Sequence, residues 1–165
     1  MSADFDQDGY VEIVYSINTG GVGAAGSYEK CLLKYKNHTF EQMKLPNDFP
    51  EEDQDIGIQI SVLAGKERNQ YIAFCPYLNS KVSFQRKTAS DNNEITIRKG
   101  DEVGGNVRGY SQIEVMDVNG SKVLILREYL NGENGINDKI ADAVFTVRFN
   151  EKDEAYIADY SIDSY

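Results

Sequence analysis

The sequence predicts an all-β fold whose antiparallel sheets pack as a sandwich or an open barrel-like stack. Short runs with an apolar residue at every second position recur along the chain, for example at 11–15, 56–60 and 145–149. Clusters of Asn, Asp and Gly separate these runs, which is the pattern of strands joined by turns. The spacing of apolar residues that is typical of helices is rare, so we expect at most one or two short helices.

The expected strands follow these alternating runs from one turn cluster to the next. In chain order they cover 10–17, 29–36, 39–43, 55–64, 70–76, 80–87, 94–99, 110–117, 122–129, 142–150 and 154–162. The segments GKERN (65–69) and NGENGIND (131–138) are expected to be loops between neighbouring strands. LPNDFPEEDQD (45–55) holds two of the three prolines and five acids, so it is the best candidate for a long surface connection.

Two segments compete as short helices. Within 27–35, Tyr28, Cys31, Leu32 and Tyr35 have helical spacing, and within 136–144 the apolar residues recur every fourth position. Each is only about two turns long, and isolated helices of that length are marginal. We therefore keep these two helices as the alternative to the strands expected at 29–36 and 142–150 and the loop expected at 131–138.

One domain over residues 1–165 is expected, because the 165-residue chain falls within the usual size of a domain. A weak internal repeat lies within it. The stretch 6–21 can be aligned with 117–132, and 31–37 with 144–150. Both copies start with an acidic, glycine-containing turn before an apolar strand, which suggests related hairpin units at 4–37 and 115–150.

The composition limits the partners. A net charge of −10 repels phosphate backbones and anionic membrane surfaces, so nucleic acid is not an expected partner. No apolar run approaches the roughly 20 residues of a membrane span, so no membrane insertion is expected. Cys31 and Cys75 are too few for a disulfide framework, and whether they form a bridge is left open.

The densest charge lies in DFDQDGYVE at 4–12, where Asp4, Asp6 and Asp8 alternate before Gly9. Hard cations such as calcium take six to eight oxygen ligands, and alternating carboxylates on a curled loop supply them. Glu12 would add a carboxylate and Tyr10 a backbone carbonyl. An EF-hand is excluded, because its twelfth position, counted from Asp4, is Tyr15 instead of Glu. The alternative is a solvated turn without metal.

The pattern D-x-D-x-D-G-x-x-[DE] followed by an apolar strand resembles the calcium loop of FG-GAP or VCBS-type repeats, as found in bacterial surface proteins. The resemblance covers about 30 residues and implies a structural calcium ion held by Asp4, Asp6, Asp8, Tyr10 and Glu12. The Phe-Gly and Gly-Ala-Pro signatures of the family are absent. At the second turn, Val115 and Val123 replace acidic positions, so no metal is expected there.

Other candidate sites are weaker. GVGAAG at 21–26 satisfies G-x-G-x-x-G, but no βα alternation follows to support a nucleotide fold. His38 is the only histidine and lies beside a turn, without the setting of a catalytic triad. Tyrosines on several strands offer an aromatic face for a glycan or protein: Tyr71, Tyr77, Tyr110, Tyr129, Tyr156 and Tyr160.

The sequence therefore indicates a non-enzymatic binding or structural module of a bacterial surface protein, with one structural calcium ion and an unidentified protein or glycan partner. Its expected place is outside the cell or in the cell envelope, with Met1-Ser2-Ala3 marking a chain trimmed from a longer precursor. Two alternatives stay open: a glycan hydrolase that uses two carboxylates, and a metal-free, cytoplasmic partner-binding protein.

Overall fold

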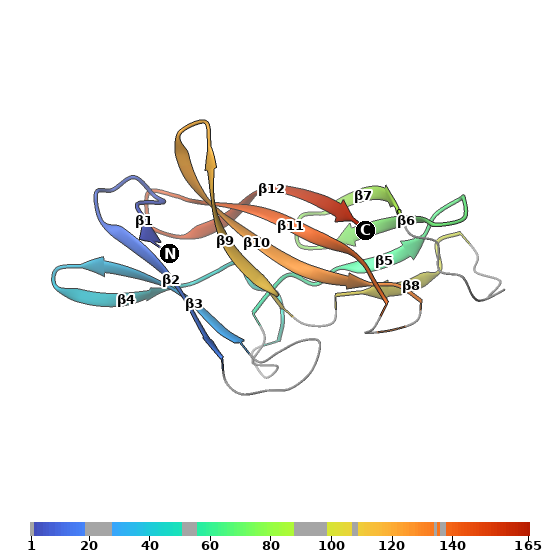
Figure 1. Ribbon diagram of the computed structural model, residues 1–165, viewed down its shortest axis with the longest axis horizontal. Helices are drawn as coiled ribbons and strands as arrows, with labels where there is room; N and C mark the ends of the chain where they lie inside the picture. Colours follow the sequence, from blue (N-terminus) through green and yellow to red (C-terminus); the bar gives the residue numbers. More distant parts are fainter. Residues whose placement is uncertain are drawn as a thin grey trace.

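The computed structural model confirms an all-β fold built from antiparallel sheets. It describes residues 2–18, 28–50, 56–87, 99–106, 109–133, 135 and 138–165, without the side chains of 16–18 and 28–30. The described residues form three four-stranded sheets, none of which closes into a barrel (Figure 1). Buried side chains from all three sheets, including Leu32, Val62 and Phe145, belong to one hydrophobic core.

The first sheet contains β1 (Ser2–Ala3), β2 (Val11–Asn18), β3 (Tyr28–Lys36) and β4 (Thr39–Met43), in that order. Alternation along the strands gives it two different faces. Its inner face carries the buried side chains Glu12, Leu32, Lys34 and Met43. Its outer face exposes Val11, Tyr15, Tyr35 and Phe40, the last to 59%. β4 ends the sheet, and Glu41 lies at its centre, opposite Lys34.

The second sheet has the order β7-β6-β5-β8. Its strands are β5 (Ser61–Ala64), β6 (Gln70–Cys75), β7 (Ser80–Gln85) and β8 (Glu102–Gly105). The third sheet has the order β12-β11-β10-β9. Its strands are β9 (Gln112–Val118), β10 (Ser121–Asn131), β11 (Lys139–Phe149) and β12 (Ala155–Ser164).

The second and third sheets are linked at two places, one near β8 and one near β7. On one side, Asn106, directly after β8, forms a β-bridge with Leu130 of β10. Gly104 permits this approach, because a Cβ there would lie 2.0 Å from the carbonyl oxygen of Asn131. On the other side, the amide of Lys87 donates a hydrogen bond to the carbonyl of Tyr165, just beyond β7 and β12. Figure 1 shows the two sheets side by side over this region.

A carboxylate lies inside the core between these sheets. Glu128 of β10 is fully buried. Its Oε1 accepts a hydrogen bond from the amide of Ile58 at 2.7 Å, and its Oε2 accepts one from the side-chain amide of Asn106 at 3.0 Å. Burial raises the pKa of Glu128 well above its ordinary value. Both oxygens are therefore satisfied by the protein, and Glu128 joins three separate segments.

The structure corrects several expectations. The alternative of a helix within 27–35 is wrong, and the strand expected at 29–36 is confirmed, since Tyr28–Lys36 is strand β3. The helix expected at 136–144 is also wrong where the structure describes it, because β11 begins at Lys139. In both, the pairing of neighbouring strands outweighs a weak helical pattern. The strand expected at 55–64 is shorter, with only Ser61–Ala64 extended.

Other expectations are confirmed or fall outside the described residues. The loop at 65–69 joins β5 to β6. Of the loop expected at 131–138, Asn131 is the last residue of β10, and the described residues 132, 133, 135 and 138 lie between β10 and β11. β1 and β8 were not expected from the sequence, and the strand expected at 94–99 lies almost wholly outside the described residues. Cys31 and Cys75 are not bridged to each other. Within the described residues, no helix is long or apolar enough to cross a membrane.

Candidate metal centre

The N-terminal acidic loop is held in place by short strands and by one buried anchor. β1 pairs with β2 so that Ala3 lies opposite Glu12, and residues 4–10 form the connection between the two strands. Phe5 is buried in the core. Gly9 has a φ of +88°, and Gln7 also has a positive φ of 63°, which lets the chain curl tightly. The loop is therefore attached to the core and does not project freely into solvent.

Backbone amides already donate hydrogen bonds to four of the six carboxylate oxygens of Asp4, Asp6 and Asp8. Both oxygens of Asp4 accept bonds, from the amides of Asp8 at 3.1 Å and Gly9 at 3.0 Å. Oδ1 of Asp6 accepts a bond from the amide of Asp8 at 3.2 Å, and Oδ1 of Asp8 accepts one from the amide of Tyr10 at 2.9 Å. Carboxylate oxygens of all three aspartates lie within 4.8 Å of one another. The loop thus concentrates negative charge around a small volume.

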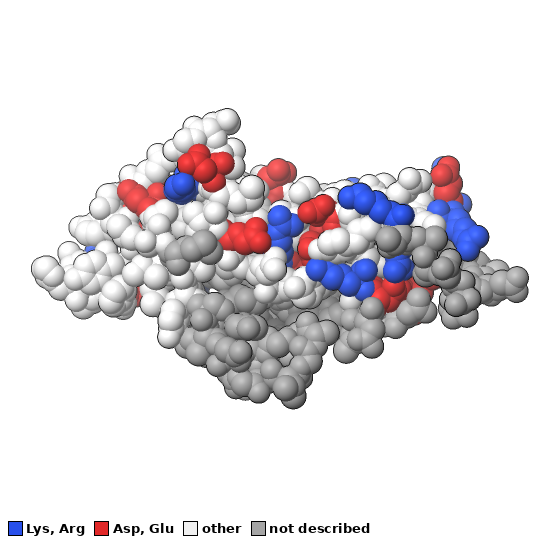
Figure 2. Space-filling model, viewed as in Figure 1, with Lys and Arg blue, Asp and Glu red and all other residues white. Residues whose placement is uncertain are grey.

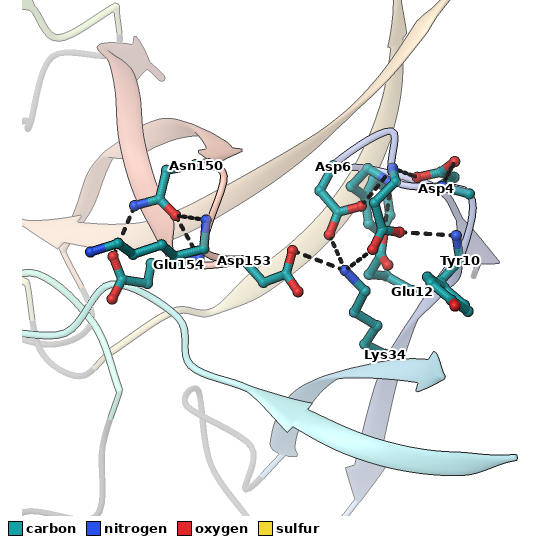
Figure 3. Close-up of polar contacts among 12 residues, drawn as sticks. Asp4, Asp6, Tyr10, Glu12, Lys34, Asn150, Asp153 and Glu154 are labelled. Carbon is teal, nitrogen blue, oxygen red and sulfur yellow. Dashed lines mark hydrogen bonds and ion pairs between the residues drawn. The ribbon is translucent and has the colours of Figure 1, made fainter. Parts of the chain in front are cut away.

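A lysine from the neighbouring strand supplies the cation in this structure. Nζ of Lys34 lies 2.5 Å from Oδ2 of Asp6, 2.8 Å from Oδ2 of Asp8 and 3.1 Å from Oδ1 of Asp153. The side chains of Lys34 and Asp6 are each only 3% exposed. Figure 3 shows the Lys34 ammonium between the acidic loop and Asp153. Neither Lys34 nor Asp153 was predicted from the sequence as part of the site.

Asp153 is presented by the turn between β11 and β12. Its φ is 61°, and its amide donates to the carbonyl of Asn150 at 3.0 Å. The side-chain oxygen of Asn150 accepts bonds from the amides of Lys152 and Glu154, which fixes the turn (Figure 3). The Lys34–Asp153 pair therefore links the first sheet to the third.

Glu12, at the end of the loop, uses only one of its two carboxylate oxygens in a hydrogen bond. It is fully buried, and its Oε2 accepts the amide of Phe5 at 2.6 Å. Its Oε1 is buried and has no hydrogen-bond partner among the described residues. Burial, together with the negative charges of Asp6 and Asp4, raises the pKa of Glu12 to about 7, although the amide of Phe5 and the charge of Lys34 oppose the shift. Figure 3 shows Glu12 beside Asp6 and Lys34.

The charges in the loop are strongly coupled. Burial raises the pKa of Asp6, although the hydrogen bond from Lys34 opposes the shift. Burial also acts to raise the pKa of Asp8, but the bond from Lys34 and the amide of Tyr10 outweigh it, so this pKa is lowered. Burial acts to lower the pKa of Lys34, and its three carboxylate partners raise it instead. At neutral pH the cluster therefore keeps an ammonium ion among carboxylates.

Most of the predicted ligands come together as oxygen donors. Asp4, Asp6 and Asp8 form the compact group, and Glu12 is adjacent. Tyr10 contributes its amide to the loop, and its ring lies 5.1 Å from the ammonium of Lys36. Oxygen donors of this kind suit a hard divalent cation, which the loop would take from solvent through its exposed side.

The second acidic turn has a different character. Oδ1 of Asp117 accepts the amide of Gly120 at 2.9 Å, and its Oδ2 pairs with Lys122 at 2.9 Å. The side chains of Asp117 and Lys122 are 52% and 49% exposed. Asn119 and Gly120 adopt positive φ, as a tight hairpin turn requires. This site is a solvated turn between β9 and β10.

The remaining candidates are placed as follows. His38 is exposed in the turn between β3 and β4. The glycine run at 21–26 lies outside the described residues. The six tyrosines do not share one exposed face: Tyr71 and Tyr110 are buried, whereas Tyr77 and Tyr156 are exposed. The exposed aromatic residues of the first sheet, Tyr15, Tyr35 and Phe40, were not recognised as a group in the sequence.

Comparison with known proteins adds no assignment, because the chain matches no family model, no curated protein and no solved structure. The site is therefore interpreted from its own geometry.

Proposed function

We propose that this chain is a non-enzymatic β module of a bacterial surface protein, and that its N-terminal loop binds one structural calcium ion. The observation that carries the proposal is the compact group of Asp4, Asp6 and Asp8 oxygens, with a buried Oε1 of Glu12 at the end of the same loop that has no hydrogen-bond partner among the described residues. An unsatisfied buried carboxylate oxygen is costly. A cation at the loop would remove that cost.

Calcium is preferred on chemical grounds. The donors are hard oxygens on a curled loop, and calcium accepts irregular sets of six to eight of them, with water completing the shell. The loop offers no nitrogen or sulfur donor among its side chains, which disfavours zinc. Bound to the folded state alone, the ion stabilises the first sheet by mass action.

The surface supports a local rather than a diffuse cation site. On the face shown in Figure 2, lysine and arginine side chains lie among aspartates and glutamates and do not separate into large patches of one sign. Among the described residues, Asp4, Asp6 and Asp8 form the one group of three or more acidic, histidine or cysteine side chains whose ligand atoms lie within 4.8 Å of one another.

One observation favours a second candidate, a metal-free binding module. Lys34 already lies where the loop's charge is greatest and neutralises part of it. In that case the ion pairs of Lys34 with Asp6 and Asp8 would hold the loop, and with it β1, against the first sheet without any metal.

Calcium titration separates the two candidates. We expect calcium to raise the melting temperature of the wild-type protein, since a ligand at 100 times its dissociation constant adds about 2.7 kcal/mol to stability. Asp8→Ala should abolish the increase. Asp117→Ala is the matched control, because it also removes a turn hydrogen bond and a lysine partner, yet it should leave the increase intact. Isothermal titration that gives no heat with the wild-type protein would favour the metal-free candidate.

A further inference from the structure

The cation site of the loop is already shared with a side chain of the protein. Oδ2 of Asp6 and Oδ2 of Asp8 both bind the ammonium of Lys34. The other oxygen of each residue accepts a backbone amide, as do both oxygens of Asp4. Among these carboxylate oxygens, Oε1 of Glu12 is the one without a hydrogen-bond partner in the described part of the chain. A divalent ion that uses Asp6 and Asp8 must therefore approach the oxygens that Lys34 holds.

An ammonium ion and a divalent cation cannot share these oxygens at low cost. Lys34 lies within 2.8 Å of both Oδ2 atoms, so a metal bound to the same atoms would be a few ångströms from a like charge. Repulsion between like charges is strong where water is excluded, and the Lys34 side chain is only 3% exposed. The carboxylates retain further lone pairs for the backbone amides, so those bonds need not break.

We propose that Lys34 is a built-in competitor for the metal: the ion enters by displacing the Lys34 ammonium from Asp6 and Asp8. This inference rests on the proposed function. Two states follow, one with the ammonium in the loop and one with the ion there. The amine lowers the apparent affinity for the ion, because the metal must break its ion pairs before it binds.

The exchange also reaches the third sheet. The same ammonium binds Asp153 at 3.1 Å, so its departure releases the ion pair between β3 and the β11–β12 turn. Lys34 and Asp153 line one groove of about 370 Å³, together with Met43, Leu45 and Ala155. Metal binding at the loop is thereby coupled to the ionic link across this groove.

Calcium affinity of Lys34→Met tests the competition. With the competitor removed, we expect calcium to bind at least about tenfold more tightly than to the wild-type protein. Lys122→Met is the matched control, because it removes a lysine from an exposed aspartate pair and should leave the affinity unchanged. An equal or weaker affinity in Lys34→Met would overturn the inference. Circular dichroism in the presence of calcium confirms that each variant is folded.

A second measurement uses the wild-type protein without any substitution. Acetylation of Lys34 by a water-soluble active ester, followed by peptide mass spectrometry, reports whether the amine is accessible. We expect Lys34 to react several times faster in saturating calcium than in EDTA, and exposed Lys66 to react at the same rate in both. A Lys34 rate that is unchanged or reduced while calcium is bound would contradict the displacement.

The two proposals fail in different ways. If the wild-type protein and Lys34→Met bind calcium equally well, the metal site stands and the competition is wrong. If only Lys34→Met binds, the competition is supported, and the natural chain keeps its loop in the amine-bound state. If neither binds, both proposals are wrong.

Discussion

The loop at 4–12 and the turn at 117–120 have closely related sequences, D-x-D-G and D-x-N-G, yet they differ in what surrounds them. The first is anchored by buried Phe5 and Glu12, and its Asp6 is 3% exposed. The second stands at the end of a hairpin, where Asp117 is 52% exposed. The related sequences adopt different backbones, with positive φ at Gln7 and Gly9 in the first and at Asn119 and Gly120 in the second. Burial and partners from other strands decide whether the charges act together.

The largest expected difference concerns the two lysines. In EDTA, Lys34→Met should lower the free energy of unfolding by about 4 kcal/mol, because it leaves buried carboxylates without a cation. Lys122→Met should leave the unfolding midpoint unchanged, since its ion pair is exposed. Urea unfolding followed by circular dichroism measures both. Similar losses in the two variants would show that the environments are equivalent after all.

Glu128, a buried acid outside both turns, provides a second test of how burial changes the contribution of a carboxylate to stability. Glu128→Gln should cost about 2 kcal/mol near pH 5, because its amide group would face the side-chain amide of Asn106, which donates to Glu128. The folded-state pKa of Glu128 is raised, so its stabilising contribution is complete below the unfolded value of 4.5 and is lost as the pH rises through the folded value.

The stability difference between wild type and Glu128→Gln should therefore shrink from pH 4.5 to pH 8. Urea midpoints at several pH values, measured for both proteins, test the sign. A difference that widens toward alkaline pH would mean that the ionised form of Glu128 is the one favoured by the fold.

The smallest expected effect is that of Asp117→Asn. The asparagine oxygen can still accept the amide of Gly120, and only a solvated pair with Lys122 is lost. Scanning calorimetry should give the same melting temperature as the wild-type protein within error, with and without calcium. A clear drop would show that this turn contributes more than its exposure indicates.

The fold class was accessible from sequence because alternating apolar residues mark strands that are buried on one face. This signal located β2, β3 and β4 within about one residue of their ends. It failed for β8, whose Glu-Val-Gly-Gly has no side-chain alternation and pairs because glycine allows close approach. At 27–35 a chance helical spacing competed with the correct strand signal, and the pairing of β3 with β2 shows that the strand was right.

The site was only partly accessible from sequence. The alternating spacing of Asp4, Asp6 and Asp8 predicted that their carboxylates lie close together, and the structure brings their oxygens within 4.8 Å of one another. Lys34 had a weaker signal, since it lies opposite Glu12 in the β2–β3 register, which requires the hairpin to be known first. Asp153 had none, because it reaches Lys34 from a turn 119 positions away in the chain, through packing of separate sheets.

The open border of β4 has a consequence for self-association. Among the described residues, β4 has a strand partner on one edge only, and a free edge can pair with a strand of another copy. Burial of exposed Phe40 would favour this pairing. Antiparallel addition centred on Glu41 would, however, place two glutamates directly across from each other, and like charges in that position oppose pairing. A glutamate in the middle of this five-residue strand is thus expected to oppose edge-to-edge addition of a second copy.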